Sequence, residues 1–364
     1  MTSADQGSLP AVMLYSLQYL RAFAALSVVF YHAEYSFNLL AGRNLDAFEF
    51  GAGGVDVFFV ISGLIMWITT SEGQKSPAAF LRNRIIRIVP LYWLFTALSV
   101  LMAVAAPSIT AIVLEAGHVI SSFFFIPWQR PGTDEWTPVM AVGWTLNLEM
   151  FFYVAFAIAL SLAVRWRLLA ICGFLTAAAV SGMIWPLTGV LKIYCSPILL
   201  EFAAGILIGA FVAPRLDGLK IDPRIYAAIA GLGLALIVIL PWQHATDLGR
   251  LWVWGIPAVL MVGGAYLHER GTQTVRLPWL VLIGDASYAL YLIHPMAVSL
   301  ASAVFRKLGL VGDAPMVTIA FFIAAIAVSV VSAVIVHRLF EKPVGRFLKG
   351  GGSAGQPATL ASGA

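Results

Sequence analysis

The sequence has few charged residues and only two cysteines. Asp, Glu, Lys and Arg make up 11% of its 364 residues, whereas soluble globular domains carry about 25%. Together with a mean hydropathy of +0.90, this scarcity excludes a soluble globular protein. Cys172 and Cys195 match no disulfide or metal-binding pattern, so we expect no metal site. The net charge of +4 gives no reason to expect a nucleic-acid partner.

Two further features are absent. The apolar runs do not alternate with polar residues as the strands of a membrane β-barrel do. The first residues lack the basic segment and cleavage site of a signal peptide, so we expect the first apolar run to be retained. Residues 1–348 are predicted to form a single transmembrane domain. Residues 349–364 are rich in Gly, Ala and Ser, which predicts a disordered tail.

What the sequence does have is a series of apolar runs near the roughly 20 residues that an α-helix needs to cross a bilayer. The runs cover 17–38, 54–70, 88–106, 141–163, 168–185, 195–213, 225–240, 251–267, 279–303 and 316–337. They predict an all-α membrane bundle of about ten transmembrane helices. Residues 118–129 are too short to cross and are flanked by polar residues and prolines. We expect this segment to be re-entrant or to lie at the membrane interface.

The Lys and Arg residues orient this bundle. Most of them fall in segments that lie on one side of the membrane if both termini share that side. The positive-inside rule makes that side the cytoplasm. This topology places Arg21 near the cytoplasmic end of the first helix and Arg250 in a loop on the opposite side.

Several ionisable residues fall within the predicted spans. Five of them, on five helices, are expected in the outer half of the membrane: His32, Asp56, Glu149, Glu201 and His294. Such groups are costly in a membrane and usually face a cavity or a partner. We therefore expect a polar cavity that opens to the outside. Each residue alone could instead form a hydrogen bond between helices.

Arginines mark the cytoplasmic side of the predicted helices. Arg21 and His32 are eleven residues apart, about three turns and roughly 16 Å along one helix face. Arg84 and Arg87 are at i and i+3, so they also share a face. An arginine pair can bind phosphate bidentately. The alternative is an anchor that contacts anionic lipid.

Six motifs contain most of these residues. They are LRAFAALSVVFYH (20–32), GGVDVFFVISGLIM (53–66), RNRIIRIVPLYW (82–93), GWTLNLEMFFY (143–153), SYALYLIHPM (287–296) and FEKPVGR (340–346). In this order and spacing they resemble the acyltransferase 3 family of integral membrane acyltransferases. The resemblance implies a ten-helix bundle in a bacterial inner membrane. It also implies an acyl-CoA donor and a hydroxyl-bearing carbohydrate acceptor, such as an exopolysaccharide or a lipid-linked glycan.

The resemblance also suggests roles for these residues in an O-acyl transfer, with acetyl as the expected group. Arg84 and Arg87 would hold the phosphates of CoA, and Arg21 would line the entry of the donor. His32 would act as a general base or as a transient acyl carrier. Glu149 would orient the imidazole or bind the acceptor.

A further set of residues is predicted to contact the acceptor: Asp56, Trp144, Tyr153, Glu201 and His294. The two aromatic side chains could pack against sugar rings, although aromatic residues at the membrane interface explain them equally well. Asp56 is as readily structural, and Pro295 beside His294 could mark a kink.

Two other functions remain open at this point. A transporter or flippase could use intramembrane His and Glu side chains to relay protons. The chain could also be a non-catalytic partner of polysaccharide-assembly proteins.

Overall fold

The computed structural model describes residues 14–42, 49–71, 76–110, 112–216, 219, 221–240, 247–312 and 314–350. Most of the predicted tail, from residue 351 onward, and the first 13 residues lie outside these ranges. All regular secondary structure in the described part is helical, and it contains no strand. The predicted all-α class is therefore confirmed.

Every predicted span coincides with a helix. These are α1 (Tyr15–Leu40), α2 (Gly54–Ser71), α3 (Pro77–Ala105), α6 (Trp144–Leu160), α7 (Val164–Ile184), α9 (Leu199–Leu207), α11 (Pro223–Ile239), α13 (Ile256–Gly271), α15 (Ser287–Lys307) and α16 (Pro315–Val336). Shorter elements join or extend them: η1 (Glu49–Gly53), α4 (Pro107–Thr110), α5 (Ala116–Phe123), η2 (Ala141–Gly143), α8 (Gly189–Tyr194), η3 (Ile208–Val212), α10 (Ala213–Leu216), α12 (Asp247–Arg250), η4 (Leu251–Gly255), α14 (Pro278–Asp285), η5 (His337–Glu341) and α17 (Lys342–Leu348).

Within the described residues, eight helical stretches are long and apolar enough to cross a membrane. Two predicted spans fall short of that standard. Helix α11 has 17 residues, and α1, with 26 residues, includes the polar Gln18, Arg21 and Glu34. The structure is thus a polytopic helical bundle in which the first helix carries an unusual share of polar side chains.

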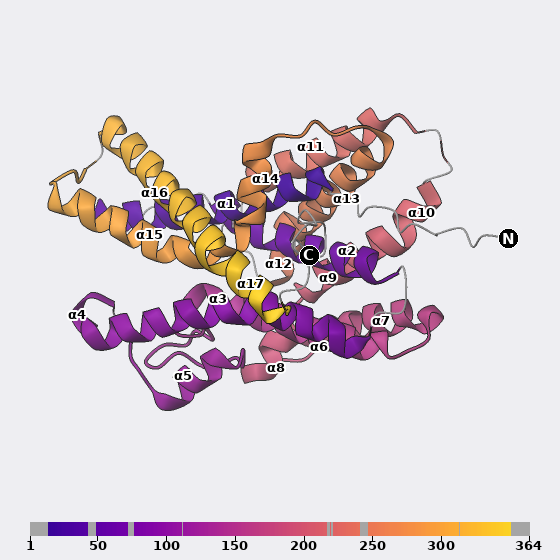
Figure 1. The fold of residues 1–364 in the computed structure, drawn as a ribbon, viewed down its shortest axis with the longest axis horizontal. Helices are drawn as coiled ribbons and strands as arrows, with labels where there is room; N and C mark the ends of the chain where they lie inside the picture. Colours follow the sequence, from indigo (N-terminus) through magenta and orange to yellow (C-terminus); the bar gives the residue numbers. More distant parts are fainter. Residues whose placement is uncertain are drawn as a thin grey trace.

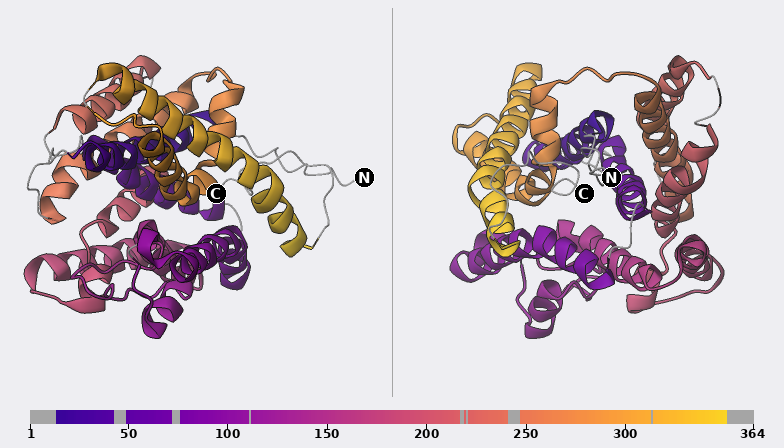
Figure 2. Two further views of the ribbon diagram at one scale, coloured as in Figure 1. Left: turned by 90° about the vertical axis from the view of Figure 1, so that its left-hand side faces the viewer. Right: turned by 45° about the vertical axis from the view of Figure 1, so that its right-hand side comes forward.

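Helices α1 and α2 occupy the middle of the bundle (Figures 1 and 2). Helix α1 packs against α2, α13, α14, α15 and α16, and α2 packs against α9 and α13. The crossing of α2 and α9 depends on glycine. A Cβ on Gly63 would lie 2.1 Å from the carbonyl oxygen of Phe202, and one on Gly205 would lie 2.1 Å from that of Val60. Small residues let two membrane helices approach this closely.

The segment predicted not to cross the membrane begins with α5, a helix of 8 residues. The chain then turns back at Phe125, which has a φ of 58°. Two hydrogen bonds hold the returning chain: His118 Nε2 to the carbonyl oxygen of Thr137 (2.9 Å) and the backbone N–H of Val139 to Ser122 Oγ (2.9 Å). The helix is far shorter than the membrane thickness, as expected for a segment that does not span.

Hydrogen bonds join the helix ends that the predicted topology puts on the cytoplasmic side. Glu269, near the end of α13, accepts from the backbone N–H groups of Tyr15 (2.8 Å) and Ser16 (3.0 Å), at the start of α1. Arg82, near the start of α3, donates to the carbonyl oxygen of Leu348 (2.8 Å), in the last turn of α17. Both pairings agree with the alternation of the predicted spans.

The last long helix of the bundle changes from α-helical to π-helical geometry near its end. Helix α16 continues into η5, a π-helical turn, and then into α17, which packs on α3 (Figure 1). In this way the C-terminal motif at 340–346 reaches the beginning of α3.

Candidate active site

A cavity between α1, α2, α3, α6 and α15 holds about 720 Å³ of space outside the protein atoms. We call it the main cavity. It has both polar and apolar walls. The polar residues that line it are Arg21, Ser62, Arg87, Thr145, Glu149, Tyr153, Ser287, Tyr288 and Tyr291. Residues from five of the six sequence motifs therefore meet around one space.

Glu149 of α6 supplies the carboxylate of the main cavity. Its Oε1 accepts a hydrogen bond from Ser62 Oγ of α2 (3.3 Å) and another from the hydroxyl of Tyr153, one turn further along α6. The ring of Tyr153 in turn lies 5.8 Å from the guanidinium carbon of Arg84. These contacts fix the carboxylate while leaving it at the cavity wall.

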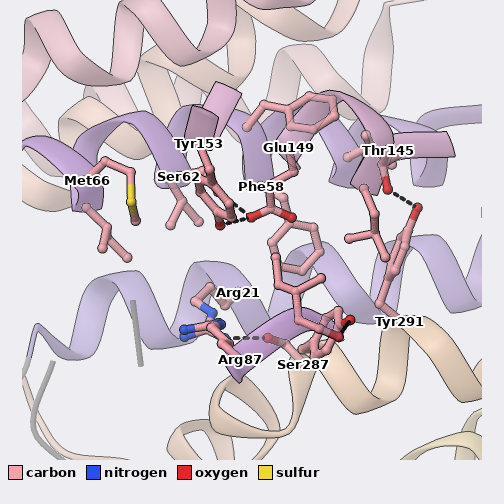
Figure 3. A pocket seen from close by; sticks show the side chains of 17 residues that line it. Arg21, Phe58, Ser62, Met66, Arg87, Thr145, Glu149, Tyr153, Ser287 and Tyr291 are labelled. Carbon is pink, nitrogen blue, oxygen red and sulfur yellow. Dashed lines mark hydrogen bonds between the residues drawn. The ribbon is translucent and has the colours of Figure 1, made fainter. Parts of the chain in front are cut away.

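Two guanidinium groups lie on the opposite wall (Figure 3). Arg21 of α1 donates from its NH2 nitrogen to Ser287 Oγ of α15 (3.1 Å). Arg87 comes from α3, and its NH1 nitrogen is buried without a hydrogen-bond partner in the described part of the protein. The main cavity thus has a carboxylate on one wall and two cations on the other, with open space between them.

Arg84 does not line the main cavity, although it precedes Arg87 by one turn. Its guanidinium packs on the rings of Phe80 (5.5 Å) and Tyr153 (5.8 Å). Its Nε and NH1 nitrogens are buried, and neither has a hydrogen-bond partner among the described residues. The two arginines of the motif therefore occupy different positions: Arg87 faces open space and Arg84 supports Tyr153.

His32 and His294 are in direct contact, with ring centroids 4.7 Å apart. His32 Nδ1 lies 2.9 Å from the carbonyl oxygen of Val28, and His294 Nδ1 lies 3.3 Å from that of Leu290. A carbonyl oxygen can only accept, so each Nδ1 donates, and in the neutral ring Nε2 then keeps its lone pair. The ring of Tyr291 connects this pair to the main cavity, at 5.9 Å from the His294 ring.

A third group of polar residues surrounds Arg250. Its Nε and NH2 nitrogens donate to Asp56 Oδ1 (3.1 Å) and Oδ2 (2.6 Å), which forms a bidentate ion pair. The buried Glu201 interacts electrostatically with both partners. The rings of Trp254 and Trp144 lie 4.8 and 5.8 Å from the guanidinium carbon. We call these five residues the Arg250 cluster.

The five residues expected in one outer cavity therefore divide into three groups. Glu149 lines the main cavity, His32 and His294 form a pair beside it, and Asp56 and Glu201 belong to the Arg250 cluster. The expectation that Arg250 lies in a loop on the outer side did not predict its ion pair with Asp56. Hydropathy placed the residue outside the spans, whereas at the end of α12 it reaches a carboxylate of α2.

Sequence reasoning also missed hydroxyl-bearing residues at the main cavity, among them Thr145, Ser287 and Tyr291. The Tyr291 hydroxyl lies 2.9 Å from the carbonyl oxygen of Val142 and 2.9 Å from Thr145 Oγ1, and Ser287 accepts from Arg21. All three residues lie inside motifs that the sequence had already singled out. Membership of a motif, together with the side-chain hydroxyl, was the available signal.

Comparison with known proteins gives a consistent result. The family model described as "Acyltransferase domain" matches residues 14–338. The exopolysaccharide production protein ExoZ of Rhizobium meliloti (strain 1021) is 36% identical over 301 residues, which cover 82% of this chain and 90% of that protein. Nodulation protein 10 of Rhizobium leguminosarum bv. viciae is 30% identical over 165 residues, or 41% of this chain and 44% of that protein.

No solved structure matches the chain. The family match covers nearly the whole described chain, and the similarity to ExoZ extends over most of both proteins. The chain therefore belongs to the acyltransferase 3 family and is a multi-pass membrane acyltransferase.

Proposed function

We propose that the protein transfers an acetyl group from cytosolic acetyl-CoA to a hydroxyl of a carbohydrate acceptor. The main cavity carries this proposal, because it sets the Glu149 carboxylate against the guanidinium groups of Arg21 and Arg87 inside a membrane bundle. Charged side chains that face a cavity inside a membrane protein are typical of a substrate path. The name of ExoZ, a protein of exopolysaccharide production, favours an exopolysaccharide or its lipid-linked precursor as the acceptor.

The donor enters from the cytoplasmic side in this proposal. Arg21 and Arg87 are near the cytoplasmic ends of α1 and α3 in the topology that the positive-inside rule favours,. They would accept the anionic donor, and the narrow pantetheine arm would carry the thioester into the main cavity. The cytoplasmic membrane of a bacterium is the location that fits both the donor and a polysaccharide acceptor.

The transfer forms one bond and breaks another. The acceptor oxygen attacks the thioester carbonyl, a C–O bond forms, the C–S bond breaks, and CoA leaves as a thiolate. The proton of the acceptor hydroxyl passes to a base and then to the thiolate sulfur, so the base is regenerated. No metal or redox partner takes part.

His32 is the proposed base. Its Nδ1 donates to the carbonyl oxygen of Val28, so Nε2 has a lone pair to take the proton. The same Nε2 could instead accept the acyl group and pass it on. His294, in ring contact with His32, would hold the imidazole in place, and Glu149 would orient the acceptor or the donor from the main cavity.

A transfer assay tests the proposal. Membranes with the native protein, His32→Ala and His32→Asn at matched expression are incubated with radiolabelled acetyl-CoA, and label in glycans is counted. We expect both variants to lose about 100-fold or more of the activity while they still bind CoA. His268→Ala is the control, because His268 bonds to the carbonyl oxygen of Pro223, away from the main cavity.

Two results would count against the proposal. Undiminished transfer by His32→Asn would remove His32 from the chemistry. If the native protein bound no acetyl-CoA and labelled no glycan, the donor would be wrong. A transporter or flippase, which has no use for CoA, would then be the better explanation.

A further inference from the structure

A second cavity lies where η5 and α17 pack against α3 and α14. It holds about 750 Å³ of space outside the protein atoms. We call it the cationic cavity, because Arg87, Lys342, Arg346 and Lys349 all line it. Its acidic and imidazole groups are Asp285, Glu341 and His337. Only Arg87 among these residues had been assigned a role from the sequence.

The C-terminal cations of this cavity share one helix face. Lys342, Arg346 and Lys349 stand at i, i+4 and i+7, a spacing that aligns side chains along an α-helix. Arg87 faces them from α3. None of the four makes an ion pair within the described part of the chain.

A bound anion would stabilise several groups of the cationic cavity. Partial burial of the amino group and the neighbouring guanidinium groups of Arg87 and Arg84 lower the pKa of Lys349. Arg87 NH1 is buried without a hydrogen-bond partner in the described residues. Like charges held this close repel one another, and a bound anion would relieve that repulsion.

The acidic groups of the cavity are already engaged. Glu341 Oε2 accepts from His337 Nδ1 (2.8 Å), and Asp285 interacts electrostatically with Arg21. His337 Nε2 is buried, and no hydrogen-bond partner for it occurs in the described chain. An imidazole held by a carboxylate on one side can donate to an anion on the other once it is protonated. The two carboxylates offset at most two of the four cations, so the cavity keeps an excess of positive charge.

Arg87 links the two cavities, because it lines both of them. A ligand bound to Lys342 and Arg346 would have one end at the bundle surface and the other at Arg87. Beyond Arg87 lie Arg21 and the carboxylate of Glu149 in the main cavity (Figure 3). This arrangement suits an elongated molecule with an anionic head and a thin arm.

We propose that the cationic cavity binds the phosphate groups of a nucleotide-bearing acyl donor, through Lys342, Arg346 and Lys349, and that Arg87 directs the arm of the donor toward the main cavity. The inference rests on the CoA-type donor proposed above. Arginine binds phosphate bidentately and lysine binds it as a point charge. An anionic lipid headgroup offers the same phosphate chemistry, but it has no arm that would extend past Arg87.

The test uses the purified full chain in nanodiscs of zwitterionic phosphatidylcholine. Two probes are titrated: CoA, and a CoA fragment that keeps the adenosine bisphosphate but lacks the pantetheine arm. The variant is Lys342→Ala/Arg346→Ala, and its charge-retaining partner is Lys342→Arg/Arg346→Lys. Arg338→Ala is the matched control, since Arg338 is an exposed cation one turn before Lys342 and does not line the cavity.

We expect the Ala variant to weaken binding of both probes about tenfold or more, as the loss of charge-assisted phosphate contacts would. The charge-retaining variant and Arg338→Ala should bind as the native protein does. The KM for acetyl-CoA should rise in the same proportion, with little change in kcat. Added phosphatidylglycerol should compete weakly or not at all.

Other outcomes separate this inference from the proposed function. If the Ala variant bound the fragment normally while acetyl transfer from acetyl-CoA proceeded, the cavity would not be the phosphate site and the proposed function would stand. Strong competition by phosphatidylglycerol would make the cavity a lipid site. If the native protein bound the fragment but transferred no acetyl group, the result would support the phosphate site and contradict the proposed acetyl transfer.

Discussion

The main cavity and the Arg250 cluster both hold charged side chains inside the bundle, but they pair those charges differently. In the Arg250 cluster the guanidinium forms a bidentate ion pair with Asp56, and two indole rings lie close to it. In the main cavity Glu149 accepts from two hydroxyl groups, and Arg87 has a buried nitrogen without a partner in the described chain.

We infer from this difference a structural role for the Arg250 cluster and a functional role for the main cavity. In a buried ion pair whose charged groups already bond to each other, few groups remain to bind a substrate. Removing one partner therefore lowers mainly the free energy of unfolding. Charges that face open space are costly to keep unless a ligand uses them. Helix α2 connects the two regions, because it supplies Asp56 to one and Ser62 to the other. Mutations on and around α2 can therefore test the distinction.

The largest effect is expected from Glu149→Gln. The amide keeps the shape of the side chain but removes the negative charge that faces Arg21 and Arg87. We expect acetyl transfer to fall about 100-fold or more, with the unfolding temperature nearly unchanged. Transfer rate and thermal unfolding in detergent are measured on the same preparation. If the Glu149→Gln protein were stable and active, the charge of Glu149 would not be needed for transfer, and the main cavity would have a structural role like that of the Arg250 cluster.

The opposite pattern is expected for Asp56→Ala. Removal of the carboxylate leaves the half-buried guanidinium of Arg250 without its ion pair. We expect a loss of about 3–5 kcal/mol in the free energy of unfolding. The double variant Asp56→Ala/Arg250→Ala should recover part of it, because the unpaired charge is gone. If Asp56→Ala were stable but inactive, Asp56 would belong to the acceptor site.

A smaller loss of stability is expected from Gly63→Ala on α2. The added methyl group would meet the carbonyl oxygen of Phe202, so α2 and α9 would have to separate. We expect a cost of about 1–3 kcal/mol and a partial loss of activity, because α2 carries residues of both regions. Ser62→Ala beside it removes the hydroxyl bonded to Glu149 without adding volume, so it tests the cavity contact separately from the packing of α2 on α9.

The smallest effect is expected from Tyr291→Phe. Its hydroxyl contacts Thr145 and the carbonyl oxygen of Val142 at the wall of the main cavity. Loss of these contacts should cost about 1 kcal/mol in stability. Because the ring stays beside His294, transfer should change little. A large fall in kcat with stability intact would instead show that the hydroxyl takes part in the reaction.

The sequence predicted the bundle well, because a long apolar run in a bilayer can satisfy its backbone hydrogen bonds by forming a membrane helix and in few other ways. The contact between His32 and His294 also fits the common depth that the topology assigned to them. The ion pair between Arg250 and Asp56 agrees with the outer side that the topology assigned to both residues, but hydropathy cannot tell which loop charge folds back onto a buried carboxylate. Motif membership singled out Thr145, Ser287 and Tyr291 only as candidates, and it could not show that their hydroxyl groups line the main cavity. Hydroxyl side chains are common in membrane helices, and which of them face a cavity depends on packing.

The π-helical turn η5 has a consequence for the register of the chain. Such a turn accommodates one residue more than an α-helical turn, and one residue corresponds to about 100° of rotation. Without it, the side chains of α17 would point in another direction around the helix, and the stripe of Lys342, Arg346 and Lys349 would turn away from α3. Deletion of a single residue within 337–341 should therefore act like the loss of several cations at once, although every one of them is still present.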